Sequence, residues 1–133
     1  MTKFDDEKQN KNLEELQKKE EEELVSVLAQ SKYNLPYINL YNVGIDNEAL
    51  RTIPEKEARA LMIAPFKLIG KNILIALRSP SPQLESQLKE GMERLNLTPI
   101  FYMVSLSSLE KVWARYEELS MAEKNKIGGI DIS

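Results

Sequence analysis

The amino-acid sequence predicts an α+β fold: a small three-stranded mixed sheet, made of a hairpin and a strand–helix–strand unit, packed with helices and preceded by an N-terminal helical segment. Residues 64–78 hold two apolar runs separated by Gly70-Lys71-Asn72, a pattern typical of a β-hairpin. A proline-led amphipathic segment at 82–95 then precedes the apolar run 100–104. A helix that connects two neighbouring strands makes those strands parallel, so the sheet is predicted to be mixed.

The composition is that of one globular domain without obvious catalytic chemistry. With 133 residues, 42% of them apolar, the chain can form one domain with its own core. Because it has no Cys and no His, disulfides, the usual zinc sites, and Ser-His-Asp or Cys-His nucleophiles are excluded. Gly70-Lys71 is followed by Asn72, and Pro65 stands where a phosphate loop has its first glycine. We therefore expect no catalytic residues, no cofactor and no metal.

Charge is distributed unevenly along the chain. Residues 1–23 hold nine acidic and five basic side chains, a balance of −4, whereas residues 24–133 hold twelve acidic and thirteen basic ones, a balance of +1. A nucleic-acid binder usually shows a basic face, so no nucleic-acid partner is expected. No apolar run is long enough to span a bilayer, and the N-terminus lacks a signal-peptide core. We expect a cytoplasmic location without direct membrane insertion.

The N-terminal part is predicted to be helical and acidic. Residues 1–19 are expected to form a flexible segment without structure over 1–12, and Leu13–Gln30 has helix-forming composition. The tract Glu20–Glu23 interrupts the apolar pattern, so we expect either two helical pieces or a helix that is anchored only after about Glu20. Its carboxylates form a solvated face rather than a metal site, because adjacent helical residues diverge.

Three leucines of this helix are candidates for contacting a partner protein: Leu13, Leu16 and Leu24. The alternative is ordinary packing or fraying, because single exposed leucines are common.

The segment 35–62 is predicted to contain one extended stretch and two short helices. Leu35–Leu40 is extended, and Pro36 favours an edge or lead-in position for it because proline donates no ladder hydrogen bond. Asp46 can cap a helix over 47–52, and Pro54 suits the first turn of a helix over 54–62.

The run 73–77 is apolar on both of its faces, which favours a central strand over an exposed edge. After it, Ser81 and Pro82 are typical of a helix start. Ser107-Ser108-Leu109-Glu110 has the spacing of a capping box and begins an amphipathic helix that ends near Leu119.

Trp113 and Tyr116 lie on the apolar side of that last helix. We expect both aromatic side chains to be core residues; the alternative is that they form a platform on which nucleic-acid bases stack. From Ser120 the amphipathic pattern ends, so 121–133 is predicted to be a linker.

The run from Leu24 to Leu119 resembles the N-terminal domain of the ATPases that power type II secretion and type IV pilus assembly. Residues 35–40 are similar to that family's Leu-Pro-aromatic-aliphatic-Asp-Leu segment, and 53–59 to its Ile-Pro-Glu-x-x-Ala-Arg signature. The resemblance assigns structural roles to a set of signature residues: Leu35, Pro36, Pro54, Glu55, Ala58, Arg59 and Pro65. It implies a secretion-ATPase N-terminal-like domain over 20–120 and a linker over 121–133 toward a motor domain. The chain is then either an excised domain or a stand-alone relative.

The resemblance implies a non-catalytic docking and regulatory module that links the motor to the cytoplasmic part of an inner-membrane platform protein. The implied partners are that platform protein and the module's own motor domain, and the implied location is cytoplasmic, peripheral to the inner membrane through the partner.

The alternative is a small-ligand sensor for a cyclic dinucleotide, with Arg51, Arg59 and Arg78 as phosphate contacts or as ordinary surface arginines. Family members that bind cyclic di-GMP carry repeated Arg-x-Leu-Gly-x-x-Leu motifs before the Leu-Pro segment. This chain has no glycine before Gly44.

Overall fold

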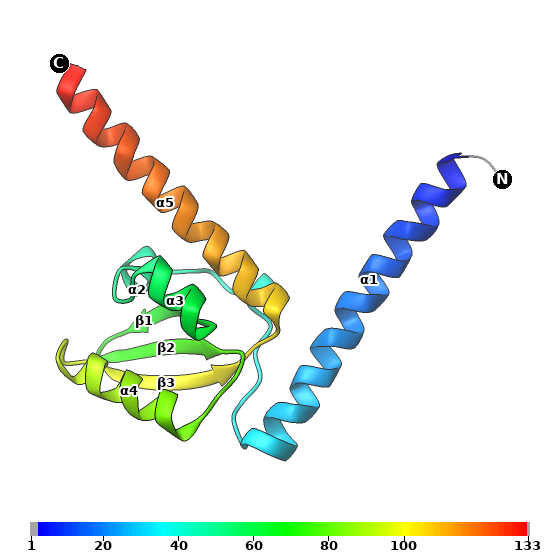
Figure 1. Cartoon of the computed structure of the whole chain (residues 1–133), viewed down its shortest axis with the longest axis horizontal. Coiled ribbons are helices and arrows are strands. Elements are labelled where there is room, and N and C mark those ends of the chain that lie inside the picture. The colour runs from blue at the N-terminus through cyan, green and yellow to red at the C-terminus, as the bar shows by residue number, and fades with distance from the viewer. Residues whose placement is uncertain (1–2, 133) are drawn as a thin grey trace.

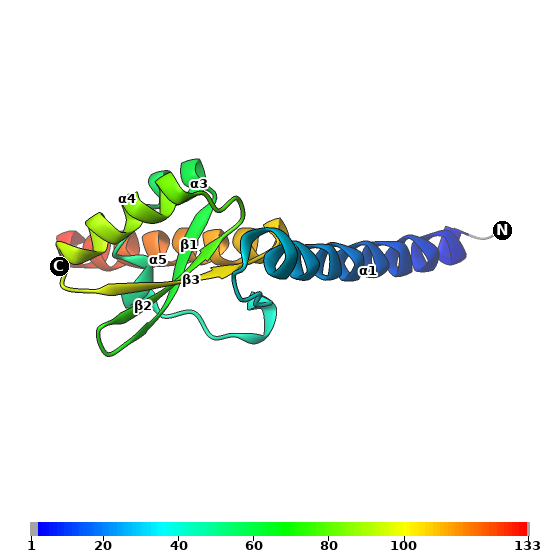
Figure 2. The same cartoon turned by 90° about the horizontal axis from the view of Figure 1, so that it is seen from below.

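The computed structural model describes the backbone of residues 3–132 and the side chains of residues 16–121. A small α+β body carries two long helices, α1 (Lys3–Leu28) and α5 (Leu106–Ile132), which project from it in different directions (Figure 1). Seen at right angles, α1 extends well beyond the body along its whole first part (Figure 2).

Helix α1 is one continuous helix, which decides between the two alternatives for the N-terminal part. It begins at Lys3 rather than near Leu13, so the expectation that 1–12 lacks structure is wrong for the described residues. The physical reason is that no Gly or Pro interrupts the chain before Pro36, while Lys, Glu, Gln and Leu are good helix formers. Its first hydrogen bond to the body, within the described side chains, is made by Glu21.

A π-helical turn, Ala29–Tyr33, follows α1 and ends at Asn34, which is in the left-handed region at φ 52°. The chain then runs beside β3 as the expected extended stretch from Leu35, and one parallel bridge joins Tyr37 to Met103. Pro36 lacks an N–H, and a short 3-10 helix, Leu40–Asn42, ends the extended stretch.

Two short helices lead into the sheet, α2 (Asn47–Leu50) and α3 (Glu55–Leu61). Asp46 occupies the N-cap position of α2, but its carboxylate accepts from Leu68 N at 3.1 Å instead of capping the helix. Its own N–H donates to the Phe66 carbonyl oxygen at 2.9 Å. Asp46 therefore covers the outer edge of the sheet. Helix α2 begins at Asn47 as expected and ends two residues earlier than expected, at Leu50.

The three strands are β1 (Ile63–Ile69), β2 (Asn72–Leu77) and β3 (Thr98–Met103), in the spatial order β1-β2-β3. β1 pairs antiparallel with β2, and β2 pairs parallel with β3, so the mixed sheet and the central position of 73–77 are confirmed. The hairpin turn places Gly70 at φ 62°. A bulge at Phe66 shifts the register of β1 between Pro65 and Lys67.

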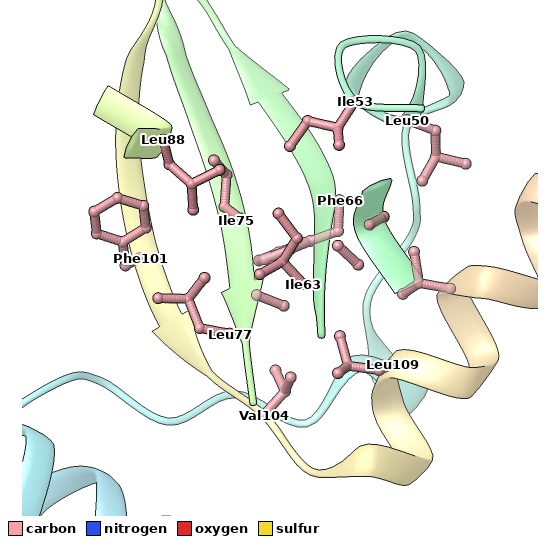
Figure 3. Close-up of a cluster of buried hydrophobic side chains, with 14 of the residues drawn as sticks. Leu50, Ile53, Ile63, Phe66, Ile75, Leu77, Leu88, Phe101, Val104 and Leu109 are labelled. Carbon is pink, nitrogen blue, oxygen red and sulfur yellow. The ribbon is translucent and has the colours of Figure 1, made fainter. Parts of the chain in front are cut away.

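Helix α4 (Pro82–Glu93) starts as predicted, with Ser81 Oγ accepting from Leu84 N at 3.2 Å. It packs against β3, whereas α2, α3 and α5 pack against β1. One continuous core results, to which all these elements contribute (Figure 3). Its labelled members in that view are Leu50, Ile53, Ile63, Phe66, Ile75, Leu77, Leu88, Phe101, Val104 and Leu109.

Helix α5 differs from the expectation at both ends. It begins at Leu106, and the side chain that accepts from a first-turn N–H is Ser105, whose Oγ lies 3.2 Å from Ser108 N. It continues to Ile132, past Ser120, because Ala, Glu, Met and Lys sustain a helix where the amphipathic pattern has ended. Trp113 and Tyr116 are buried, which confirms them as core residues.

Candidate functional site

The base of α1 is held by a small apolar cluster separate from the main core. Val25 and Ala29 pack on Met103, and all three side chains are fully buried. Four half-buried residues complete the cluster: Leu28, Tyr33, Leu35 and Tyr37. The last turns of α1 are therefore fixed to the end of β3.

Two hydrogen bonds that glutamates of α1 accept strengthen this attachment. The Ser107 hydroxyl, in the first turn of α5, donates to Glu21 Oε2 at 2.9 Å. The Tyr37 hydroxyl donates to Glu22 Oε1. Part of the acidic tract Glu20–Glu23 thus anchors the helix, while Glu20 and Glu23 remain exposed, so the expectation of a solvated face holds for half of the tract.

Burial raises the pKa of Tyr37 far above its ordinary value of 10, and the hydrogen bond to Glu22 and the charges of Glu22 and Glu21 raise it further. Tyr37 therefore keeps its proton and acts as a donor to the carboxylate at neutral pH. Glu22 Oε2 is buried without a hydrogen-bond partner among the described residues. Tyr37 is thus the side chain on which the burial of this carboxylate depends.

Exposed aliphatic side chains lie along the opposite side of α1. Leu16, Leu24 and Val27 are 55%, 60% and 61% exposed. We call these three residues the α1 row. Leu13 was predicted to belong with Leu16 and Leu24, but its side chain lies outside the described residues. Partner contact by the three leucines stays a prediction.

The signature helix α3 has a structural role. Pro54 is its N-cap residue, and Ala58 is fully buried in the main core. The Ala58 amide donates to the Pro54 carbonyl oxygen at 3.0 Å, which closes the first turn. The small side chain lets α3 pack closely against β1 and α5.

Arg59 joins α3 to α5 on the outside of the molecule. Its Nε lies 2.9 Å from Glu55 Oε2, and its Nη2 lies 3.2 Å from Glu117 Oε1. Its guanidinium stands 5.3 Å from the centre of the Trp113 ring. Such exposed pairs contribute little individually, but together they orient the arginine across the two helices.

The other signature residues also serve the fold. Leu35 N donates to the Ala29 carbonyl oxygen at 2.9 Å, and the Pro36 carbonyl oxygen accepts from Met103 N at 2.8 Å. Pro65 is buried within β1, next to the bulge.

The candidate phosphate-binding arginines come from three different elements. Arg59 is engaged by two carboxylates, as described above. Arg51 is exposed and follows α2, whereas Arg78 is half-buried and follows β2, with its N–H donating to the Met62 carbonyl oxygen at 3.1 Å. The three candidate side chains are thus carried by α3 and by the residues that directly follow α2 and β2.

Two grooves flank the base of α1. One is lined by Glu22, Glu23, Ser26, Val27 and Tyr37. The other lies between α1 and the 3-10 helix and is lined by Lys18, Lys19, Glu22, Glu23, Asn39, Tyr41 and Asn42. Both adjoin the acidic tract, and Lys18 and Lys19 of the second groove add two cations, so the surroundings of the α1 base are polar and carry both signs of charge.

Sequence reasoning missed the contacts that hold the 3-10 helix on α5. Lys111 Nζ donates to the carbonyl oxygens of Leu40 and Tyr41, at 2.7 and 3.0 Å, and Leu40 N donates to Ser108 Oγ at 3.2 Å. These residues are about 70 positions apart in the sequence, so no local pattern indicates them.

Within the described residues, no group of three or more acidic side chains is arranged to hold a metal ion. No described helix is long and apolar enough to cross a membrane.

Comparisons with known proteins and solved structures identify relatives of this chain. No curated protein matches the chain. A solved structure described as MshE with cdg matches with a TM-score of 0.60 and 26% identity. The match covers 70% of this chain and 66% of the other, so this chain spans just under two thirds of that protein's length. The family model of the MshEN domain matches residues 33–123, well over half of the chain. The chain therefore belongs to the MshEN family, the N-terminal domain of secretion and pilus-assembly ATPases.

Proposed function

We propose that this domain is a docking and regulatory module that links a secretion or pilus-assembly motor to the cytoplasmic part of its inner-membrane platform. The observation that carries the proposal is the organisation of α1. Residues 33–123 match the family, whereas all of α1 precedes the matched region. A family domain thus carries a long helix that is fixed at its base and presents an exposed apolar row.

The anchors of α1 suit transmission of movement. Glu21 ties the base of α1 to Ser107 in the first turn of α5, and α5 runs toward the C-terminal end of the chain. A partner that pulls or orients α1 would therefore act on the helix that leads toward a following motor domain. Rigid helices joined at one packed point are able to carry such a coupling.

Direct binding tests the proposal. The cytoplasmic part of an inner-membrane platform protein is immobilised, and the chain is passed over it in a biosensor measurement. Saturable binding that disappears when residues 1–33 are deleted is expected. Lack of binding by the intact chain at high micromolar concentration would contradict the docking role.

A second candidate function is sensing of a cyclic dinucleotide, because the solved structure with 26% identity is MshE with cdg. Against it, the sequence lacks the Arg-x-Leu-Gly-x-x-Leu repeats of cyclic di-GMP-binding members, and Arg59 is already paired with two carboxylates. Calorimetric titration with cyclic di-GMP distinguishes the two functions. We expect no heat of binding at micromolar ligand, and saturable binding would favour the sensor.

A further inference from the structure

We propose that the α1 row (Leu16, Leu24 and Val27) binds one amphipathic helix of a partner protein, and that Lys or Arg side chains border the apolar face of that helix. This inference rests on the proposed docking function and specifies the chemistry of the partner segment. Three observations support it: the direction of the row, the packing of α1, and the charges between the row's members.

The row faces away from the body. An α-helix turns about 100° per residue, so Leu24 and Val27 lie about 80° and about 20° around the axis from Leu16. Val25 lies about 180° from Leu16 on the same basis, and Val25 is the residue that packs on Met103. The body therefore covers the side of the helix around Val25, and the aliphatic row lies outside that side, with Val27 bordering the groove beside Tyr37.

The long free part of α1 lacks packing within the described chain. Its hydrogen bonds to the body begin at Glu21, and Figures 1 and 2 show the preceding turns standing clear of the body. Helices in proteins gain most of their stability from packing an apolar face. Single exposed aliphatic residues need no explanation. Leu16 on the free part of α1 and Leu24 and Val27 at its base lie within about 80° of one another, and together they form a face that a partner helix can cover.

The charges in the row select a basic partner. Glu20 and Glu23 lie about 40° and about −20° from Leu16, within the same face. Both are exposed, and neither makes a hydrogen bond or an ion pair within the described residues. Lys19, four residues before Glu23, is not paired with it. Two carboxylates between aliphatic side chains are complementary to a helix that carries cations beside its own apolar residues.

A second copy of the chain fits this face less well. Leu16 and Leu24 are equally distant from Glu20 along the helix. An antiparallel copy that paired Leu16 with Leu24 would therefore place Glu20 opposite Glu20, and like charges at such a position are destabilising. The carboxylates thus favour a basic partner over self-association.

The test uses the intact chain and two synthetic 18-residue probe peptides that fold as amphipathic helices. Both carry Leu along one face; one has Lys and the other has Glu beside that face. Fluorescence anisotropy of the labelled peptides measures the dissociation constants. We expect the Lys peptide to bind at least tenfold more tightly than the Glu peptide.

Matched variants then assign the binding to the row. The double variants Leu24→Ala/Val27→Ala and Glu20→Gln/Glu23→Gln should each weaken binding of the Lys peptide at least fivefold. The controls are Leu95→Ala, which changes a leucine that is 51% exposed just after α4, and Glu90→Gln, which changes an exposed glutamate of α4; both should leave the binding unchanged. Equal binding of both peptides, or equal losses in the controls, would overturn the inference.

Two further measurements separate this inference from the docking role. Light scattering should show a monomer; a dimer that Leu24→Ala abolishes would identify a second copy as the occupant and overturn the inference. Platform protein that binds the wild-type chain and both row variants equally would overturn the inference while leaving docking in place. Binding of the Lys peptide to the row, without binding of the platform protein, would overturn docking instead.

Discussion

Ala58 shows how closely the signature helix is packed against the core. Its side chain is fully buried in the main core, whereas Ala60, two residues later on the same helix, is exposed. Ala58→Asp would bury a carboxylate without a partner, and we expect a loss of at least about 2 kcal/mol of unfolding free energy. Ala60→Asp is the matched control and should change stability little. Thermal melts followed by circular dichroism compare the two, and equal melting temperatures would contradict the packing of α3.

Two tyrosines, the buried Tyr116 and the half-buried Tyr37, make the unfolding free energy depend on pH in the alkaline range. Burial is the largest cause that raises the pKa of Tyr116 above its ordinary value of 10, and the charges of Glu55 and Glu57 raise it further. Burial is also the largest cause that raises the pKa of Tyr37. In the unfolded chain these tyrosines lose their protons near pH 10, whereas the folded chain retains them. The contribution of the two tyrosines to the unfolding free energy is therefore complete below pH 10 and is lost progressively as the pH rises above 10.

Urea unfolding at several pH values between 8 and 11.5 measures this dependence. Tyr116→Phe should make the decline of the unfolding free energy above pH 10 less steep, because one of the two linked groups is gone. The same variant should be less stable at pH 8, because it leaves the Ile53 carbonyl oxygen, 2.8 Å from the lost hydroxyl, without its donor. Tyr41→Phe, which changes an exposed side chain, should leave the slope unaltered. If the slope of unfolding free energy against pH were unchanged in Tyr116→Phe, the raised pKa of Tyr116 would be contradicted.

At the scale of elements, the hairpin depends on one glycine. Gly70 adopts φ 62°, a conformation in which a Cβ is strained, although no atom lies within 4 Å of the place a Cβ would take. Gly70→Ala should therefore lower stability by about 1 kcal/mol. Gly91 lies within α4, also with open space around it, and Gly91→Ala should raise stability by about 0.5 kcal/mol or more. Chemical unfolding measures both, and a shift of the same sign in the two variants would be inconsistent with these roles.

The attachment of α1 depends on the pair of Tyr37 and Glu22. Tyr37→Phe removes the only donor to a carboxylate that has one oxygen buried without a partner in the described chain. We expect the local cost to be about 1–3 kcal/mol and the α1 base to open more often. Hydrogen exchange should become faster in residues 21–33 and stay unchanged in β2. Unchanged exchange at the α1 base would show that the apolar cluster around Val25 suffices.

For the whole molecule, the body should fold without the first part of α1. Residues 1–19 precede the first described hydrogen bond between α1 and the body, which Glu21 makes. Deleting 1–19 should leave the melting temperature of the body unchanged. Deleting 1–33 removes Val25 and Ala29 and uncovers Met103, so the melting temperature should fall. Differential scanning calorimetry of the two truncated chains checks both outcomes, and a fall with the shorter deletion would show that 1–19 packs on the body.

Local patterns predicted the order and type of most elements. The two-faced apolar run 73–77 became the buried central strand, and Ser81-Pro82 became a helix start, because periodicity and turn chemistry act over a few residues. The predicted details of two helix starts are wrong because nearby side chains form other hydrogen bonds. Asp46 bonded across to Leu68 instead of capping α2, and Ser105 accepted from the first turn of α5 in place of Ser107.

The sequence by itself determined the α+β class, the mixed sheet, the burial of Trp113 and the family resemblance, since these follow from residue type and spacing along the chain. Only the tertiary structure decided which side of α1 is free and which is anchored. Glu22 and Tyr37 are 15 residues apart, and Glu21 and Ser107 are 86 apart. Such contacts depend on how separate elements pack together, and that packing, rather than the row of leucines alone, leaves Leu16, Leu24 and Val27 facing away from the body.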